Sequence, residues 1–254
     1  MKISATIITL NEEKNISRCV NSIKSFCDEI IVLDSYSTDS TKSICDDLPV
    51  KFFERKFTGY IDQKNHAASL ATNDLIFNID ADEEVSTDLQ EEILNLKNNS
   101  NQIIAAEVNR QTQYVNHWVK YCGWFPDRLI RLYDRRHCSW EGELIHEKIM
   151  PPKNSTPLKL NSLMRHYSYS SIQDHLNQTK KFTTISAKQY LKQGRKTSFF
   201  HITLRPLFQF FRDYILKLGI LDGKYGVVIC LINSYSVYLK YSKLKALKQG
   251  QNID

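Results

Sequence analysis

The chain has 254 residues, of which 42% are hydrophobic and 24% are charged, and its formal net charge is +6. This composition predicts a globular protein that can bury a sizeable core in one large domain, or in a domain with an appendage. The 6 cysteines include no C-x-x-C pair, which excludes the common zinc spacings and a disulfide framework. We therefore expect reduced thiols in a cytoplasmic protein.

Charge is unevenly distributed along the chain. From Lys180 onward there are 14 Lys and Arg residues against 3 acidic residues, whereas the part before it holds 20 basic and 25 acidic residues. The two parts are therefore expected to meet different partners. The sequence contains no RNP-like motif, zinc spacing or helix-turn-helix pattern, and the first part is acidic, so we expect no nucleic-acid partner.

An apolar run at residues 3–10 is cut off by Asn11-Glu12-Glu13, so it reads as a first strand and not as a signal peptide. Helical patterns and apolar strands then alternate. Further strands are predicted at 29–34, 50–55 and 75–80, and helices at 15–26, after the turn that begins at Ser35, and at 60–71. This alternation predicts an α/β fold with a mostly parallel sheet that helices cover on both faces.

Polar residues follow three of these strands, at the sheet edge where ligands bind in such folds. They are Asn11-Glu12-Glu13, Asp34 with Asp39, and Asp80-Ala81-Asp82. We expect them to converge on one crevice. The sequence contains neither G-x-G-x-x-G nor G-x-x-x-x-G-K-[ST], so phosphate binding there cannot rely on a glycine-rich loop. We assign Asp39 to a helix cap and Glu13 to a first helical turn.

Asp80 and Asp82 form a D-x-D motif. It raises the question of why an apolar strand is followed by several negatively charged residues. Asp80 and Asp82 are two residues apart, so in an extended chain their carboxylates can point to the same side. Such hard oxygen ligands suit Mg²⁺ or Mn²⁺, which the site would share with a diphosphate. The alternative is that these acids open the next helix, where the helix dipole favours negative charge. That helix has its own predicted capping box at 87–90, so we favour the metal.

The second half of the chain adds strands and then basic helices. Strands are predicted at 103–115, 128–136 and 140–149, with aromatic residues gathered between the first two. A long helix is predicted at 171–194, ending at Gly194, and apolar segments follow at 198–219 and 225–248. Neither segment is an uninterrupted span of about 20 apolar residues, so no transmembrane helix is predicted. A basic, aromatic helix fits a membrane surface; the alternative is a helical cap on the first domain with solvated lysines.

Five segments together resemble one known family. They are ATIITLNEEKNI (5–16), EIIVLDSYSTDST (29–41), QKNHAASLATNDLIFNIDADEEV (63–85), GWFPDRLIRLYDRR (123–136) and WEGELIHEKI (140–149). In this order they look like a family 2 glycosyltransferase of the GT-A fold, and most like its lipopolysaccharide-core β-glucosyltransferase subgroup. We accordingly expect a GT-A domain over 1–170, with a nucleotide-sugar half at about 1–100 and an acceptor half at about 101–170. A helical, basic, membrane-associating region is expected over 171–254.

The resemblance implies an inverting transfer of a hexose such as glucose from a nucleoside-diphosphate sugar, with a UDP-sugar favoured. The acceptor would be a hydroxyl of a lipid-linked or lipopolysaccharide-core molecule at the inner face of the cell membrane. The residues expected at the donor are Thr9, Asn11, Glu12, Asp34, Lys64, Asp80 and Asp82. By position, the first three line the nucleotide pocket, Asp34 contacts the base or ribose, Asp80 faces the ribose or donor sugar, and Asp82 ligates Mg²⁺ or Mn²⁺. Lys64 is either a phosphate contact or a solvated cation.

Transfer also needs a base that removes the proton of the attacking hydroxyl. Read as one strand, WEGELIHEKI sets Glu143 and Glu147 on one side and His146 on the other. The candidates for the base are Asp127, Glu141, Glu143, His146 and Glu147, of which Glu143 is the first choice, followed by Asp127 and Glu147. His146 is a candidate third metal ligand, or holds the diphosphate. Trp124, with Asp127, is expected at the acceptor, where its ring can stack on a sugar; the alternative is a place in the core.

Two other functions use the same features. One is a metal-dependent nucleotidyltransferase or hydrolase built on the same acids. The other is a non-catalytic membrane-bound adaptor that binds the nucleotide sugar. A transferase releases nucleoside diphosphate whereas a nucleotidyltransferase makes or consumes triphosphate, and metal-dependent donor turnover would eliminate the adaptor.

Overall fold

The computed structural model describes residues 1–99, 102–143 and 146–253, without the side chains of Glu143 and His146. Within this range the chain forms two compact units. Unit 1 consists of Met1–Arg110 and Asp127–His166, and unit 2 of Gln111–Pro126 and Tyr167–Asp254. All residues predicted to bind the donor lie in unit 1.

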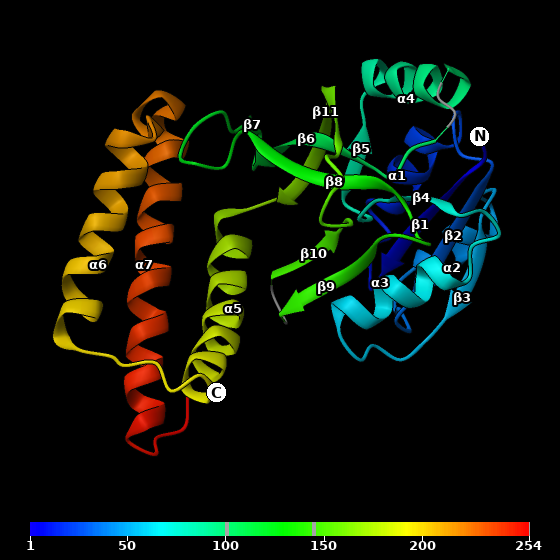
Figure 1. Cartoon of the computed structure of the whole chain (residues 1–254). Helices are drawn as coiled ribbons and strands as arrows, with labels where there is room; N and C mark the ends of the chain where they lie inside the picture. The colour runs from blue at the N-terminus through cyan, green and yellow to red at the C-terminus, as the bar shows by residue number, and fades with distance from the viewer. Residues whose placement is uncertain (100–101, 144–145, 254) are drawn as a thin grey trace. The chain divides into compact units, whose positions relative to one another are not determined.

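A large sheet carries the predicted strands (Figure 1). Its order is β3-β2-β1-β4-β8-β6-β11-β5, and β7 pairs with β6. The strands are β1 (Ile3–Thr9), β2 (Glu29–Asp34), β3 (Lys51–Glu54), β4 (Leu75–Asn78), β5 (Glu83–Val85), β6 (Ala105–Tyr114), β7 (His117–Trp118), β8 (Asp127–Asp134) and β11 (Leu158–Tyr169). β3, β2, β1 and β4 are parallel, whereas β8 pairs antiparallel with both β4 and β6. The predicted α/β class is confirmed, and the first four strands of the sheet are parallel.

Helices cover both faces of the parallel strands. They are α1 (Ile16–Ile23), α2 (Thr41–Asp46), α3 (Tyr60–Ser69) and α4 (Thr87–Asn99). α1 and α4 pack on one face through a core that includes Ile7, Val20 and Leu89. α3 packs on the other face, where Ala68 lies in the same cluster as Ile31 (Figure 1). Because both faces of β1 and β4 are buried, these strands are near-continuous apolar runs in the sequence.

The capping of α4 differs from the prediction by one residue. Ser86, and not Thr87, caps the helix, because its hydroxyl accepts a hydrogen bond from the Leu89 amide at 3.3 Å. The side-chain amide of Gln90 donates to the carbonyl oxygen of Val85, also at 3.3 Å. Ser86 and Thr87 are adjacent and both can cap a helix, so the sequence alone allows α4 to begin after either residue. The D-x-D acids still lie upstream of the helix, as expected.

The segment 140–149 is a hairpin and not the single strand that the sequence predicted. β9 (Ser139–Glu143) and β10 (His146–Met150) pair antiparallel, with Glu147 opposite Gly142. The alternation of side chains along one strand therefore does not relate Glu143 to Glu147. One long strand and two antiparallel strands show the same alternation of apolar and polar residues. The pattern therefore could not reveal that the chain reverses direction within this segment.

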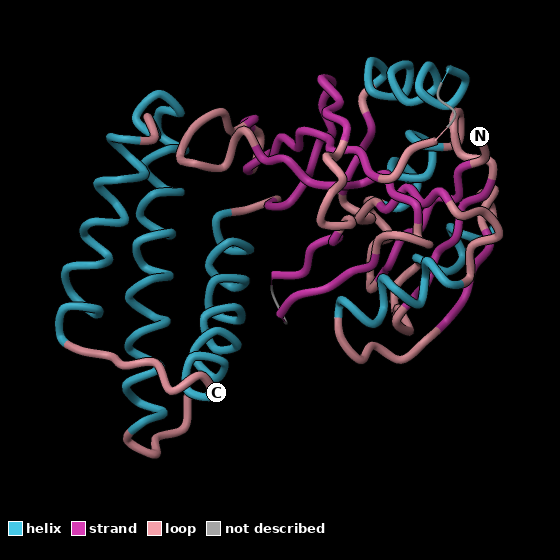
Figure 2. Tube along the Cα trace, viewed as in Figure 1, coloured by secondary structure: helices cyan, strands magenta, loops and turns pink. Residues whose placement is uncertain are grey.

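Unit 2 is helical apart from the ends of β6 and β11 and the short β7. Its helices are α5 (Ile172–Lys192), α6 (Phe199–Phe211), the π-helix η1 (Arg212–Leu216), the 3-10 helix η2 (Gly219–Asp222) and α7 (Gly223–Lys248). α5 ends where predicted, with Gly194 in the left-handed region at φ 66°. α7 packs against both α5 and α6 (Figure 2). Of the helices in the described part of the chain, none combines the length and apolar content that crossing a bilayer requires.

Candidate active site

The carboxyl ends of β1 and β2 form the first wall of the site. Asp34, at the end of β2, is 1% exposed and accepts hydrogen bonds from the Thr9 hydroxyl at 2.7 Å and from the Ser37 amide and hydroxyl, each at 2.6 Å. These bonds fix the loop that follows β2 against the end of β1. Asp34 thus organises the loop, and its predicted contact with the base or ribose stays a prediction.

The turn after β1 lies against the same loop. Asn11 has a left-handed backbone with φ 58°, and its side-chain oxygen accepts from the Thr38 amide at 2.8 Å. The backbone amide of Glu12 donates to the Thr41 hydroxyl at 2.8 Å. Burial, and then the negative charges of Asp82 and other nearby acids, raise the pKa of Glu12. The site therefore gathers carboxylates, as predicted from the three strand ends.

Asp80 is held between two cations. The ammonium of Lys64 lies 3.1 Å from one carboxylate oxygen, and the guanidinium of Arg131 donates to the other at 2.9 Å. Burial opposes ionisation, but the charges of Lys64 and Arg131 hold the pKa of Asp80 well below its usual range. The Lys64 side chain is only 5% exposed, so of the two readings of Lys64 the structure excludes a solvated cation.

A chain of alternating charges runs behind Asp80. Arg131 also binds Glu83, which is fully buried, at 2.5 Å. Arg110 then joins Glu83, at 3.0 Å, to Asp127, whose Oδ2 accepts two bonds from the Arg110 guanidinium at 2.8 and 2.9 Å. Buried charges are tolerated when each is paired and hydrogen-bonded, so these pairs fix Asp80 in a defined position.

The D-x-D lies in a turn and not in the extended chain that we expected. The Glu83 amide donates to the Asp80 carbonyl oxygen at 2.9 Å, so Asp80 and Asp82 have different neighbours. Oδ2 of Asp82 lies 3.1 Å from Nε2 of His166, which β11 brings to the site. No group of three or more His, Cys, Asp or Glu side chains within the described ranges is arranged to hold a metal. Asp82 and His166 together bring one carboxylate oxygen and one imidazole nitrogen to this end of the sheet.

A pocket of about 330 Å³ opens beside Asp80. It is lined by Lys64, Asp80, Glu107, Arg110, Arg128, Leu129, Ile130, Arg131, Trp140, Glu147, Lys148 and Ile149. A carboxylate oxygen of Glu147 lies 3.6 Å from the Lys64 ammonium, which also lies 4.3 Å from the centre of the Trp140 ring. The pocket therefore brings together three predicted residues, namely Lys64, Asp80 and Glu147. The side chains of the other two predicted residues on this hairpin, Glu143 and His146, lie outside the described part of the chain.

The sequence profile of the family described as Glycosyl transferase family 2 matches residues 4–149. This chain belongs to glycosyltransferase family 2. An uncharacterized glycosyltransferase of Rickettsia felis is 32% identical over 99% of this chain and 93% of its own length. The lipopolysaccharide core biosynthesis glycosyltransferase LpsC of Rhizobium meliloti is 27% identical over 100% of this chain and 97% of its own. A solved structure of S. aureus TarS, residues 1–349, has a TM-score of 0.48 and 16% identity over 99% of this chain and 92% of that one.

Family membership confirms the resemblance in the sequence, and with it the expectation of an enzyme. The candidate site also contains residues that the sequence did not single out, notably Arg110, Arg131 and His166. Arg131, which is buried between apolar residues of β8, was a usable signal, because a charged side chain in a buried strand needs a partner. His166 had no such signal, because it lies 84 residues from Asp82 along the chain.

Trp124 lies in unit 2, in an aromatic cluster. Its ring centre is 5.9 Å from that of Tyr114, 5.7 Å from that of Tyr169 and 5.5 Å from that of His175. Trp124 is partly buried in this cluster and packs against its buried residues. Its predicted contact with the acceptor stays a prediction.

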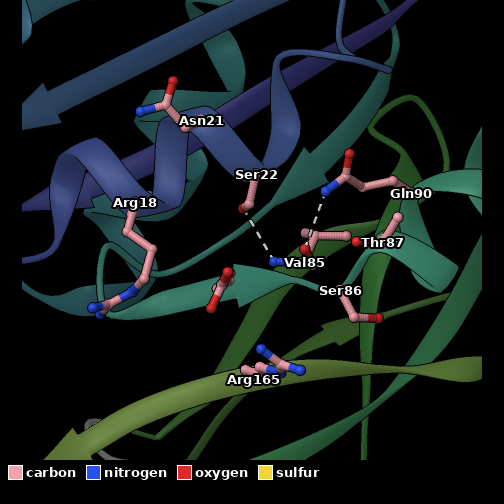
Figure 3. Close-up of a pocket in the computed structure, with 9 residues that line it drawn as sticks. Arg18, Asn21, Ser22, Val85, Ser86, Thr87, Gln90 and Arg165 are labelled. Carbon is pink, nitrogen blue, oxygen red and sulfur yellow. Dashed lines mark hydrogen bonds between the residues drawn. The ribbon is translucent and has the colours of Figure 1, made fainter.

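A second pocket, of about 280 Å³, lies in unit 1 among α1, β5, the start of α4 and β11 (Figure 3). Arg18 and Arg165 line it together with Ser22, whose hydroxyl accepts from the Val85 amide at 3.1 Å (Figure 3). None of the described residues that line it is a predicted site residue of the glycosyltransferase. Of these two pockets, only the one beside Asp80 is lined by predicted site residues.

Proposed function

We propose that this family 2 glycosyltransferase moves a hexose from a UDP-sugar to a hydroxyl of a lipid-linked or lipopolysaccharide-core acceptor, with inversion at the sugar. The observation that carries the proposal is a pocket lined by both Asp80 and Glu147, whose carboxylates each pair with the Lys64 ammonium. The similarity to LpsC over the whole chain supports the acceptor class. The protein would work at the cytoplasmic face of the cell membrane.

The nucleotide would lie over the ends of β1 and β2, against the loop that Asp34 holds. Thr9, Asn11 and Glu12 border that position, and Asp80 is the carboxylate offered to the ribose or the donor sugar. Lys64 would attract the diphosphate, because it is a cation beside the strand ends. Asp82 and His166 would hold Mg²⁺ or Mn²⁺, which neutralises charge on the leaving diphosphate. The imidazole nitrogen is a softer donor than a carboxylate, which favours Mn²⁺ over Mg²⁺.

Glu147 is the base that the geometry favours. Its carboxylate lines the pocket beside Asp80, whereas Asp127 is bound to Arg110 and does not line it. Glu147 would take the proton of the acceptor hydroxyl while that oxygen bonds to the anomeric carbon. The bond from that carbon to the diphosphate breaks on the opposite side, so the configuration inverts. Glu143, the first choice from the sequence, stays a candidate.

Incubation of the full chain with a panel of nucleotide sugars tests this function. With Mn²⁺ we expect release of UDP from a UDP-hexose, faster in the presence of a membrane-extracted glycolipid acceptor, and loss of turnover in excess EDTA. Release of pyrophosphate, or consumption of a triphosphate, would identify a nucleotidyltransferase instead. Binding of the nucleotide sugar without any turnover would leave only the adaptor.

A further inference from the structure

Unit 2 exposes many large apolar side chains within one segment of the chain, residues 199–221. Within α6 and the turns that follow it, six of these side chains are each at least 60% exposed. They are Phe199, Phe200, Leu207, Phe208, Leu216 and Leu221, and we call them the α6 ridge. Soluble proteins rarely expose contiguous apolar patches of this kind, and such patches mark surfaces that bind a partner or a membrane.

The α6 ridge is preformed on a folded support. The Ser234 hydroxyl of α7 donates to the carbonyl oxygen of Pro206, which lies inside α6, at 2.7 Å. The Arg205 guanidinium also donates to the Tyr241 hydroxyl. These bonds attach α6 to α7, so the ridge does not need to fold when it meets a partner.

The charges around the α6 ridge select the kind of partner. Exposed cations precede and follow it, including Lys196, Lys217 and Lys224. Between residues 195 and 253 the only acids are Asp213 and Asp222, which are 2% and 4% exposed. Both are bound within unit 2, Asp213 to Arg212 at 3.0 Å and Asp222 to the Tyr121 amide at 2.9 Å. In the described part of this segment, the surface therefore offers apolar and cationic groups and no exposed carboxylate.

We propose that the α6 ridge docks the enzyme on an anionic lipid bilayer, with its aromatic and aliphatic side chains in the interface and its cations on the lipid phosphates. Apolar burial and attraction to anionic headgroups act together in such binding, and neither needs a spanning helix. A second copy of the chain fits less well, because it would bring the same positive charge to the contact. The inference rests on the proposed function for its cellular setting and names the surface that would place the enzyme beside a lipid-linked acceptor.

Co-sedimentation with vesicles tests the docking surface. We expect the full chain to bind vesicles of phosphatidylcholine mixed with phosphatidylglycerol, and to bind pure phosphatidylcholine vesicles at least about tenfold more weakly, with added salt weakening the anionic binding. The double variant Leu207→Ser with Phe208→Ser should lose at least about tenfold in affinity for the anionic vesicles. Leu158→Ser is the matched control, because Leu158 is an exposed leucine of unit 1, at 46%; it should bind as the wild type.

A second double variant changes charged residues only, so its effect on binding does not depend on the apolar side chains of the ridge. Lys196→Glu with Lys224→Glu should weaken anionic binding without changing the circular dichroism spectrum or the melting temperature. Equal binding of wild type and both double variants would overturn the inference, and so would a wild type that binds no vesicles. A dimer of the wild type that the Leu207→Ser, Phe208→Ser variant dissociates, without vesicle binding, would assign the ridge to a second copy. UDP release in the absence of vesicles reports on the proposed function separately, because the ridge variants leave unit 1 unchanged.

Discussion

Lys64 is the residue at which the two carboxylates of the proposed site meet. It lies 3.1 Å from Asp80 and 3.6 Å from Glu147, and its side chain is almost fully buried. A buried cation that pairs with two carboxylates holds both in position, and the charge of Lys64 lowers the pKa of Asp80. The position of this one ammonium group is therefore expected to affect donor binding and transfer together.

Replacing Lys64 with methionine tests that role. The variant removes the charge that contributes most to lowering the pKa of Asp80, so that pKa rises and the acidic limb of the pH–activity profile should move to higher pH. Turnover at neutral pH should fall by at least about a hundredfold, in line with the loss of a charge at a reacting centre. Lys148→Met is the control, because Lys148 is exposed at the same pocket. An unshifted profile for Lys64→Met would contradict the clamp on Asp80.

His175 makes the stability of unit 2 depend on pH. It lies 3.3 Å from the Tyr114 hydroxyl, and burial lowers its pKa from 6.5 to about 4. The unfolded chain therefore binds a proton as the pH falls below about 6.5, whereas the folded chain does not until about 4. We expect the free energy of unfolding to fall as the pH is lowered through this window.

The measurement is the urea midpoint of the wild type and of His175→Gln at several pH values between 4 and 7.5. The wild type should lose stability more steeply with acid than the variant, because glutamine does not titrate. Parallel curves for the two proteins would show that His175 is not the group responsible.

At the scale of the elements, η2 packs on α7 through two glycines. A Cβ built at Gly226 would lie 1.8 Å from the backbone carbonyl oxygen of Gly219, and that oxygen cannot move away as a flexible side chain can. Gly226→Ala should therefore destabilise unit 2 by about 3 kcal/mol or more, at the upper end of the cost of overpacking. Ser236→Ala, in the same helix, should change stability little. A melting temperature of Gly226→Ala equal to that of the wild type would contradict the packing of these two elements.

Some elements were predictable from the sequence and others were not. Strands β1, β2 and β4 were predictable because their burial on both faces leaves apolar runs bounded by polar residues. The β9–β10 hairpin was not, because alternation does not record a reversal of direction. In the candidate site, Asp80 and Asp82 were singled out because they follow a buried strand. Arg131 was not singled out, although a charged residue in a buried strand was a usable signal. His166 gave no signal, because it meets Asp82 only through the pairing of distant segments.

At the scale of the whole molecule, chemistry and charge are divided between the two units. Unit 1 holds the carboxylates and the pocket beside Asp80, and unit 2 holds the α6 ridge and most of the excess positive charge. The difference in charge between the two parts of the chain thus falls largely between the two units, and the expectation that they meet different partners stays a prediction. For a transferase with a lipid-linked acceptor, one unit would carry out the reaction and the other would provide access to the acceptor.

The most direct test of the proposed transfer compares Glu147→Gln with the wild type in one experiment that measures both donor affinity and transfer. Glu141→Gln is the control, because Glu141 is an exposed carboxylate on the neighbouring strand β9. We expect Glu147→Gln to bind the UDP-sugar with unchanged affinity and to transfer the sugar at least about a hundredfold more slowly, because a base acts only in the transfer step. Transfer by Glu147→Gln at the wild-type rate would contradict the assignment of Glu147 and of the pocket beside Asp80 as the place of reaction.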